Sequence, residues 1–295
     1  EVGDGNLNLV FIVEGPKGAV VVKQALPYVR LVGDSWPLPL KRSFFEYHAL
    51  SRQAERDPGM VPEIFHFDAG QAIIVMEFLS PHIILRRALI AGQELPKIAK
   101  DLGLFLARTL FRGSDLCLDT KIRKADLALF ADNVALCDIT ESLVFSDPYY
   151  DAKLNRHTAP QLDGIVKELR ADRDLKVAAQ RLKHIFAATP ETLLHGDFHT
   201  GSVMVTAEQT RVIDPEFAFY GPIAFDVGML LANFWMSYFS QSGHETAGNR
   251  ASMRRYLLKV TVDIWEIFRD EFSRLWHGER TGILYRRSLF EDQGD

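Results

Sequence analysis

The sequence predicts an α+β fold of two lobes, in which a small β-rich N-terminal lobe precedes a larger helical lobe. Short β-branched and apolar runs, separated by turn residues, fill the first part of the chain. From Glu94 onward, apolar residues recur at the three- and four-residue spacing of amphipathic helices. We expect residues 1–79 to form the first lobe, with a hinge at its end, and residues 80–295 to form the second.

The elements of the N-terminal lobe follow from local patterns. Two pairs of strands are expected, because each pair of apolar runs flanks a cluster of glycine, proline or aspartate. One helix is expected between the pairs, because its apolar residues follow helical spacing. These elements are predicted at 9–13, 19–24, 42–53, 64–67 and 71–77.

In the second lobe, the clearest helical stripes cover residues 98–109, 175–186 and 253–268. The longest apolar run, 223–239, is short for a bilayer span and contains Asp226 and other polar groups. We therefore expect a buried helix there, and no membrane association.

Composition excludes several classes of function. With 47% hydrophobic and 25% charged residues, the 295-residue chain has an ordinary globular composition. The net charge of −5 provides no basic footprint for a nucleic-acid partner. Two cysteines, Cys117 and Cys137, are too few for a disulfide framework and favour a reducing compartment.

The most informative segment is 193–202, LLHGDFHTGS. Gly196 permits a tight turn that exposes the carboxylate of Asp197. We assign Asp197 to an acceptor hydroxyl, as orienting group or general base. His195 is interpreted as a residue that braces the loop by hydrogen bonding. His195 and His199 are four residues apart, but the intervening glycine and the absence of His-Glu-x-x-His argue against a zinc site.

A second acidic segment follows the predicted strand 211–213. Asp214 and Glu216 flank Pro215, and alternating carboxylates on a rigid turn can both face one hard cation such as Mg²⁺. The alternative is a solvated acidic turn. Asp226, at a predicted helix start, is expected to cap the helix or brace a loop rather than take part in catalysis.

Residues of the first lobe complete a pattern suited to phosphoryl transfer. Lys23 ends a valine-rich strand and Glu46 lies on the following helix, as in the ion pair that positions nucleotide phosphates in kinases. Singly, each reads as an ordinary surface residue. Glu77, Phe78 and Leu79 end the lobe, where a kinase hinge would bind adenine; the plainer reading is a strand end.

Taken together, these segments resemble the aminoglycoside phosphotransferase and choline kinase group of protein-kinase-like enzymes. That group's signature is His-Gly-Asp-x-His-x-x-Asn followed by Ile-Asp-x-Glu. Here Ser202 replaces the final asparagine. The replacement removes one expected metal ligand and places more weight on Asp214 and Glu216.

A narrower resemblance, to the 5-methylthioribose kinase family, covers nearly the whole chain and includes Ser202. It rests on longer strings than the kinase signature. They are EVGDGNLN (1–8), VKQALPY (22–28), GDSWP (33–37), LHGDFHTGS (194–202) and VIDPEFAFYGP (212–222).

This resemblance implies a two-lobed protein-kinase-like fold and ATP-dependent phosphorylation of the 1-hydroxyl of S-methyl-5-thioribose, in methionine salvage, by a cytosolic homodimer. It implies nucleotide contacts at Asn8, Lys23 and the hinge residues 77–79, with Asp197 at the sugar. ATP and Mg²⁺ are the implied cofactors, with the metal at Asp214 and Glu216. The family also has an Arg-Arg pair that holds the sugar; the surroundings of Arg286-Arg287 do not match that motif, and we expect the pair beyond residue 295.

Two other functions compete with this reading. A related kinase could act on an aminoglycoside, whose polycationic nature calls for an acidic site, or on an amino-alcohol. A nucleotide-binding pseudokinase scaffold would typically have lost catalytic or metal-binding carboxylates. Asp197, Asp214 and Glu216 are all present.

Overall fold

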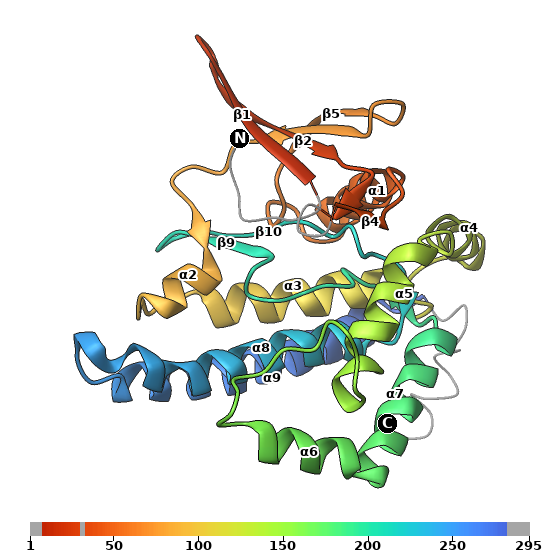
Figure 1. The fold of residues 1–295 in the computed structure, drawn as a ribbon. Coiled ribbons are helices and arrows are strands. Elements are labelled where there is room, and N and C mark those ends of the chain that lie inside the picture. Colours follow the sequence, from red (N-terminus) through yellow and green to blue (C-terminus); the bar gives the residue numbers. More distant parts are fainter. Residues whose placement is uncertain (1–7, 30–32, 282–295) are drawn as a thin grey trace.

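The computed structural model describes residues 8–29 and 33–281, and Figure 1 shows its arrangement. A small antiparallel sheet with one helix lies at one end of the molecule, and the rest is mostly helical. The α+β class predicted from the sequence is confirmed.

The N-terminal sheet has the strand order β1-β2-β6-β5, and all its pairs are antiparallel. Gly15 and Gly18 face each other where β1 turns into β2. In the centre of the sheet Lys23 pairs in register with Ile74. The bounds are Asn8–Gly15 (β1), Gly18–Ala25 (β2), Ile64–Asp68 (β5) and Ile73–Glu77 (β6).

Between β2 and β5 lie the short pair β3 (Tyr28–Val29) and β4 (Gly33–Pro37) and the helix α1 (Arg42–Arg56). The first and last buried side chains of α1 are both arginines, and Glu46 between them is also buried. Charged residues that a helix buries need partners: those of Arg42 and Glu46 lie in the candidate site, and Arg56 faces Asp126.

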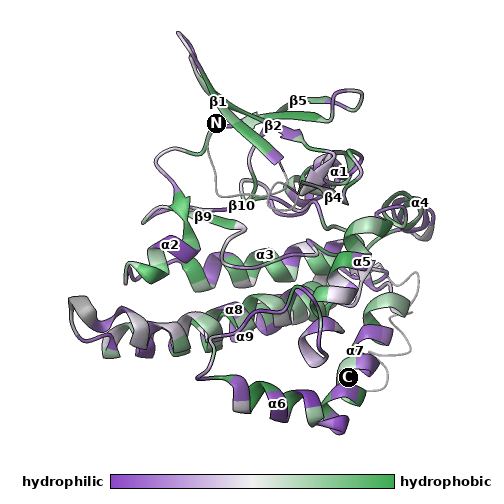
Figure 2. Ribbon diagram, viewed as in Figure 1, coloured by the Kyte–Doolittle hydropathy of each residue, from purple (hydrophilic) through white to green (hydrophobic). Residues whose placement is uncertain are grey.

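The helical part is built on three long helices, α3 (Ile98–Arg112), α8 (Ala224–Ser240) and α9 (Ala251–Glu279). α3 packs along α9, and α9 packs along α8. Figure 2 shows hydrophobic residues on the N-terminal strands and along α3 and α8. Removal of these apolar side chains from water supplies the main stabilisation of the fold. Core residues with at most 1% exposure include Leu102, Phe105, Leu106, Leu230, Phe234, Leu257 and Ile264.

Shorter helices surround this core. They are α2 (Leu85–Ile90), α4 (Thr120–Phe130), α5 (Val134–Leu143), α6 (Asp163–Ala171) and α7 (Arg173–Ala188), with the 3₁₀ turns η1 (Asp147–Tyr149) and η2 (Gln241–Ala247). The buried helix expected over run 223–239 is present as α8, but only part of it is buried. Trp235, Met236 and Phe239 of α8 are 45%, 62% and 68% exposed, because only one side of α8 faces the core. None of the described helices has the length and apolar character that a membrane crossing requires.

Short strands in the helical part carry the two acidic loops. β8 (Thr192–Leu193) pairs with β11 (Tyr220–Gly221). β9 (Val203–Val205) lies between β10 (Thr210–Val212) and β7 (Ile83–Ile84). Pairing of β9 with β10 and of β8 with β11 brings the loop 194–202 beside the loop 213–219.

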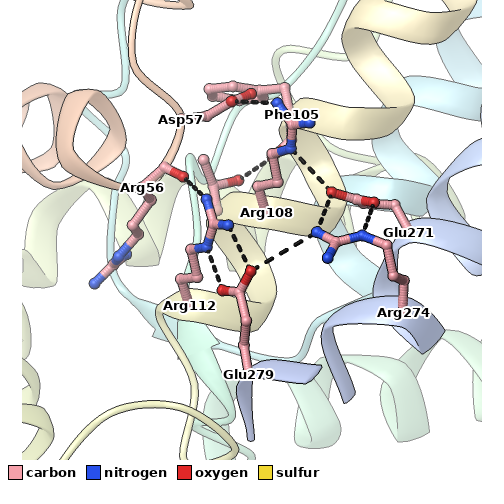
Figure 3. A network of polar contacts seen from close by, with 9 residues as sticks. Arg56, Asp57, Phe105, Arg108, Arg112, Glu271, Arg274 and Glu279 are labelled. Atoms are coloured by element: carbon pink, nitrogen blue, oxygen red, sulfur yellow. Dashed lines mark hydrogen bonds and ion pairs between the residues drawn. The ribbon is translucent and has the colours of Figure 1, made fainter. Parts of the chain in front are cut away.

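A polar network fixes the end of α1 against the helical core (Figure 3). Arg108 of α3 bonds to Asp57 (Nη1–Oδ1, 2.8 Å), just beyond α1, and to Glu271 of α9 (Nε–Oε1, 3.0 Å). One turn later, Arg112 binds Glu279 (Nε–Oε2, 2.8 Å) and the backbone carbonyl of Arg56. Charged hydrogen bonds of this kind fix geometry, and here they hold α1 relative to α3 and α9.

Candidate active site

The site begins with a tight turn in the loop 194–202. Gly196 has a φ of +84°, and a Cβ there would lie 2.1 Å from the backbone oxygen of Phe217. Only glycine fits this conformation and this close approach. The turn brings the two acidic loops into direct contact and leaves the side chain of Asp197 37% exposed.

Buried polar groups brace this turn from below. Asp226, at the start of α8, accepts hydrogen bonds from the backbone N–H groups of His195 (2.6 Å) and Gly196 (3.1 Å). Burial raises the pKa of Asp226 to about 7, against the opposing effect of these two hydrogen bonds. His195 donates from Nε2 to the carbonyl of Ile213 at 3.0 Å. The bracing roles predicted for His195 and Asp226 are thus present.

A buried ion pair joins the first lobe to this region. Lys23 of β2 and Glu46 of α1 are 2.8 Å apart (Nζ–Oε1), and the sequence predicted this contact. Lys23 also pairs with Oδ1 of Asp214. Asp214 has a φ of +69°, an uncommon conformation for a non-glycine residue, and it turns its carboxylate toward the lysine.

Three carboxylates therefore surround one lysine. Oxygen atoms of Glu46, Asp214 and Glu216 lie within 4.8 Å of one another. Burial acts to lower the pKa of Lys23, but these three carboxylates outweigh it and raise that pKa above its ordinary value. Burial raises the pKa of Glu46 to about 8 and also raises that of Glu216, whereas Lys23 holds the pKa of Asp214 below its usual range.

Glu216 is held by two residues of the first lobe. Arg42 binds it (Nε–Oε2, 3.2 Å), and Asn8 donates from Nδ2 to the same oxygen at 3.2 Å. Arg42 also donates from Nη2 to Oδ1 of Asn8 at 3.3 Å, which closes a ring of three side chains. Asn8 was predicted to contact nucleotide; the structure places its side-chain amide on Glu216, and the nucleotide contact stays a prediction.

Two further residues of this site were missed by the sequence reasoning. Arg42 precedes Glu46 by four positions, so both lie on one helix face, and that spacing was the available signal. Asn133, before α5, donates to the backbone carbonyls of Glu216 (2.9 Å) and Ala218 (3.0 Å) and so holds the second acidic loop. No local sequence signal identified Asn133.

The predicted hinge lies at the end of β6, apart from the carboxylate cluster. The backbone N–H of Glu77 donates to the carbonyl of Glu63 at 2.8 Å, and Leu79 is buried. Glu77 also pairs with Val20 of β2 in the sheet, and its side chain accepts from the backbone N–H of Glu63. Arg286-Arg287 and residues 1–7 lie outside the described residues.

The donor set of the cluster fits a hard divalent cation. Mg²⁺ takes oxygen ligands, and the carboxylates of Glu46 on α1 and of Asp214 and Glu216 on the second acidic loop, which approach one another to within 4.8 Å, supply them. Asp214 is the most accessible of the three, with its side chain 44% exposed, whereas Glu46 and Glu216 are each 2% exposed. Asp197 and Asp214, on adjacent loops, are therefore the carboxylates that a bound substrate can reach.

Comparison with known proteins agrees with this arrangement. The pattern described as "Phosphotransferase enzyme family" matches residues 1–256. Methylthioribose kinase 1 of Oryza sativa subsp. japonica is 48% identical over 284 residues, which cover 96% of this chain and 66% of the rice protein. The methylthioribose kinase of Escherichia coli O45:K1 (strain S88 / ExPEC) is 44% identical over 99% of this chain and 70% of its own length. The chain thus spans about two thirds of the length of these curated relatives.

Solved structures show the same fold at low sequence identity. A glucosamine kinase in complex with glucosamine, ADP and inorganic phosphate superimposes with a TM-score of 0.53 at 17% identity, covering 92% of this chain and 70% of that one. Crystal form A of glucosamine kinase gives a TM-score of 0.51 at 13% identity, over 93% of this chain and 80% of that one. By family pattern and by sequence identity, the chain belongs to the phosphotransferase enzyme family, among the methylthioribose kinases.

Proposed function

We propose that this chain catalyses ATP-dependent phosphorylation of the 1-hydroxyl of S-methyl-5-thioribose, a reaction of methionine salvage. The observation that carries the proposal is the cluster of Lys23, Glu46, Asp214 and Glu216 beside Asp197. Such a site can hold nucleotide phosphates next to a carboxylate that faces an acceptor. The 41–48% identity to curated methylthioribose kinases supports the choice of acceptor.

In this proposal the residues of the first lobe hold the nucleotide. Lys23 contacts the α- and β-phosphates, and Glu46 fixes the lysine through their ion pair. Hinge residues 77–79 bind adenine through their backbone. We place the lobe boundary after Leu79, as the sequence predicts.

Asp197 then orients the sugar hydroxyl in line with the γ-phosphate and accepts its proton late in the transfer. Asp214 and Glu216 would hold Mg²⁺, which neutralises charge on the transferring phosphates when bound. Glu216 arrives already oriented by Arg42 and Asn8. This orientation of Glu216 favours the transition state, whereas Asp214 would first exchange its pairing with Lys23 for the metal ion.

The test is an acceptor screen on the purified full-length protein. ADP release would be followed with methylthioribose, glucosamine, choline, ethanolamine and an aminoglycoside, each at saturating Mg-ATP. We expect turnover with methylthioribose to exceed turnover with every other acceptor. Preference for an aminoglycoside or an amino-alcohol would assign a related kinase, and nucleotide binding without any turnover would assign a pseudokinase.

We also propose that the protein acts as a cytoplasmic homodimer, on the resemblance to its family. Light scattering of the eluting protein would measure its mass in solution. A mass of one chain would contradict the dimer.

A further inference from the structure

A second histidine of the loop 194–202 lies against the carboxylate assigned to the acceptor. Nε2 of His199 is 3.3 Å from Oδ2 of Asp197. The sequence pattern around this histidine argues against a zinc site. Its hydrogen bonds show a different use.

The opposite ring nitrogen of His199 is an acceptor. The backbone N–H of Gly201 points at Nδ1 at 2.9 Å, and Nη2 of Arg86 lies 3.4 Å from the same atom. Oγ of Ser202 also lies 3.2 Å from Nδ1, but Gly201 N–H and the Arg86 guanidinium only donate hydrogen bonds, so a proton on Nδ1 would collide with theirs. The imidazole therefore carries its proton on Nε2, the nitrogen that faces Asp197.

The surroundings fix this geometry. The backbone N–H of Arg86 donates to the carbonyl of Thr200 at 2.9 Å, which attaches α2 to the loop. Ser202 is buried and donates from Oγ to the backbone carbonyl of Asp197 at 2.9 Å. A Cβ at Gly201 would lie 2.6 Å from Cε1 of His199, so glycine is what lets the loop close over the ring.

The two oxygens of Asp197 are therefore inequivalent. Oδ2 lies 3.3 Å from Nε2 of His199, whereas no hydrogen bond or ion pair of the described residues engages Oδ1. A carboxylate can rotate about its Cβ–Cγ bond, and a donor on one oxygen limits that rotation. We propose that His199 is a positioning residue, which holds Oδ2 of Asp197 so that Oδ1 is presented to the acceptor hydroxyl. This role rests on the proposed function of Asp197.

Two amide replacements separate positioning from simple bracing of the loop. The side-chain amide nitrogen of glutamine reaches the place of Nε2, so His199→Gln keeps a donor to Asp197. The amide oxygen of asparagine reaches the place of Nδ1, so His199→Asn keeps the contact with Gly201 and loses the donor. A positioning role predicts that the glutamine variant is the more active, and a bracing role predicts the reverse.

We expect His199→Asn to lower kcat by about 10–100-fold, with the KM for ATP changed less than about twofold. His199→Gln should retain most of the wild-type kcat. Equivalent replacements of His184, an exposed residue of α7, are the matched controls and should leave both parameters unchanged. Nucleotide-induced thermal shifts would verify that each variant folds and binds ATP.

A spectroscopic measurement tests the same contact without turnover. ¹⁵N-correlated spectra of the wild-type histidines, with His199 assigned by its loss in His199→Gln, should show protonated Nε2 and unprotonated Nδ1. A proton on Nδ1, or equal activity of the two variants, would overturn the positioning role alone. A wild-type protein that releases no ADP with any acceptor would overturn the proposed function and this role with it.

Discussion

Nε of Arg42 lies 3.2 Å from Oε2 of Glu216, and the two side chains are 0% and 3% exposed. Arg42 is in the first turn of α1, and Glu216 is on the second acidic loop. Their contact therefore attaches the first lobe to the proposed metal-binding residues. Removal of one partner leaves the other charge buried and unpaired, at a large cost in free energy. The stability of the fold should therefore depend strongly on this pair.

Arg42→Met should lower the free energy of unfolding by about 3–5 kcal/mol, because it leaves Glu216 buried without its cation. Urea denaturation would measure the loss. The matched control is Lys41→Met at the preceding residue, whose ion pair with Asp132 is more than half exposed on both sides. Exposed pairs contribute about 0–1 kcal/mol. Equal losses for both variants would show that the Arg42–Glu216 contact does not stabilise the fold.

Gly196→Ala should destabilise the protein by about 1–3 kcal/mol, because φ is +84° and the new Cβ would meet the backbone oxygen of Phe217. The displacement of the loop should also reduce kcat. Gly164→Ala on α6 should change the free energy of unfolding in the opposite direction, because no atom lies within 4 Å of the position that its Cβ would take. A helical Gly→Ala change there should stabilise by about 0.5–1 kcal/mol. Thermal and urea unfolding would measure whether each variant is less or more stable than the wild type.

The buried His195 predicts a dependence of stability on pH. Burial lowers its pKa to about 4, from an ordinary value of 6.5. Between these values the unfolded chain binds a proton that the folded chain does not, so acidification across this window favours unfolding. The stability of the wild type relative to His195→Gln should therefore fall by about 3 kcal/mol between pH 7 and pH 4.

Glutamine is the chosen replacement because its amide nitrogen can still donate to the carbonyl of Ile213 and does not titrate. The exposed His184→Gln variant should follow the wild-type curve. If the wild type and His195→Gln kept a constant difference at every pH, burial of a neutral His195 would be the wrong explanation.

Lys23→Met should reduce kcat/KM for ATP by about 100-fold, because it removes the cation that faces the phosphates in the proposed mechanism. Steady-state kinetics with varied Mg-ATP would measure it. Lys17→Met, in the exposed turn between β1 and β2, is the control and should match the wild type. A Lys23 variant with wild-type kcat/KM would remove this residue from the nucleotide site.

Local patterns were sufficient to predict the strands of the N-terminal sheet and the contact between Lys23 and Glu46, but not the short pair β3 and β4. Both residues lie on elements with clear periodicity, β2 and α1, and the contact follows from the order of those elements. Arg42 was not predicted, because a charged residue in a first helical turn normally faces solvent. Only the approach of the loop 213–219, more than 170 residues away in sequence, buries it.

Contacts between segments that are distant in sequence also determine the surroundings of His199 and the exposure of one side of α8. The sequence placed His199 beside Asp197 but could not show that Gly201 and Arg86 point at one of its ring nitrogens. A long and mainly apolar run predicted that α8 is a buried helix. Because only one side of that helix meets the core, Trp235 and Phe239 remain exposed. The apolar composition of a helix does not show how many other elements pack against it.

The measurement that tests the central claim most directly is ADP release with methylthioribose by the wild type and by Asp197→Asn. Removal of the carboxylate charge should reduce the sugar-dependent rate by about 10²–10⁴-fold, the usual contribution of a positioned acid–base group. ATP affinity, measured by calorimetry, should stay within about twofold of wild type, because Asp197 faces the acceptor. An Asp197→Asn protein that phosphorylates methylthioribose at the wild-type rate would contradict the account.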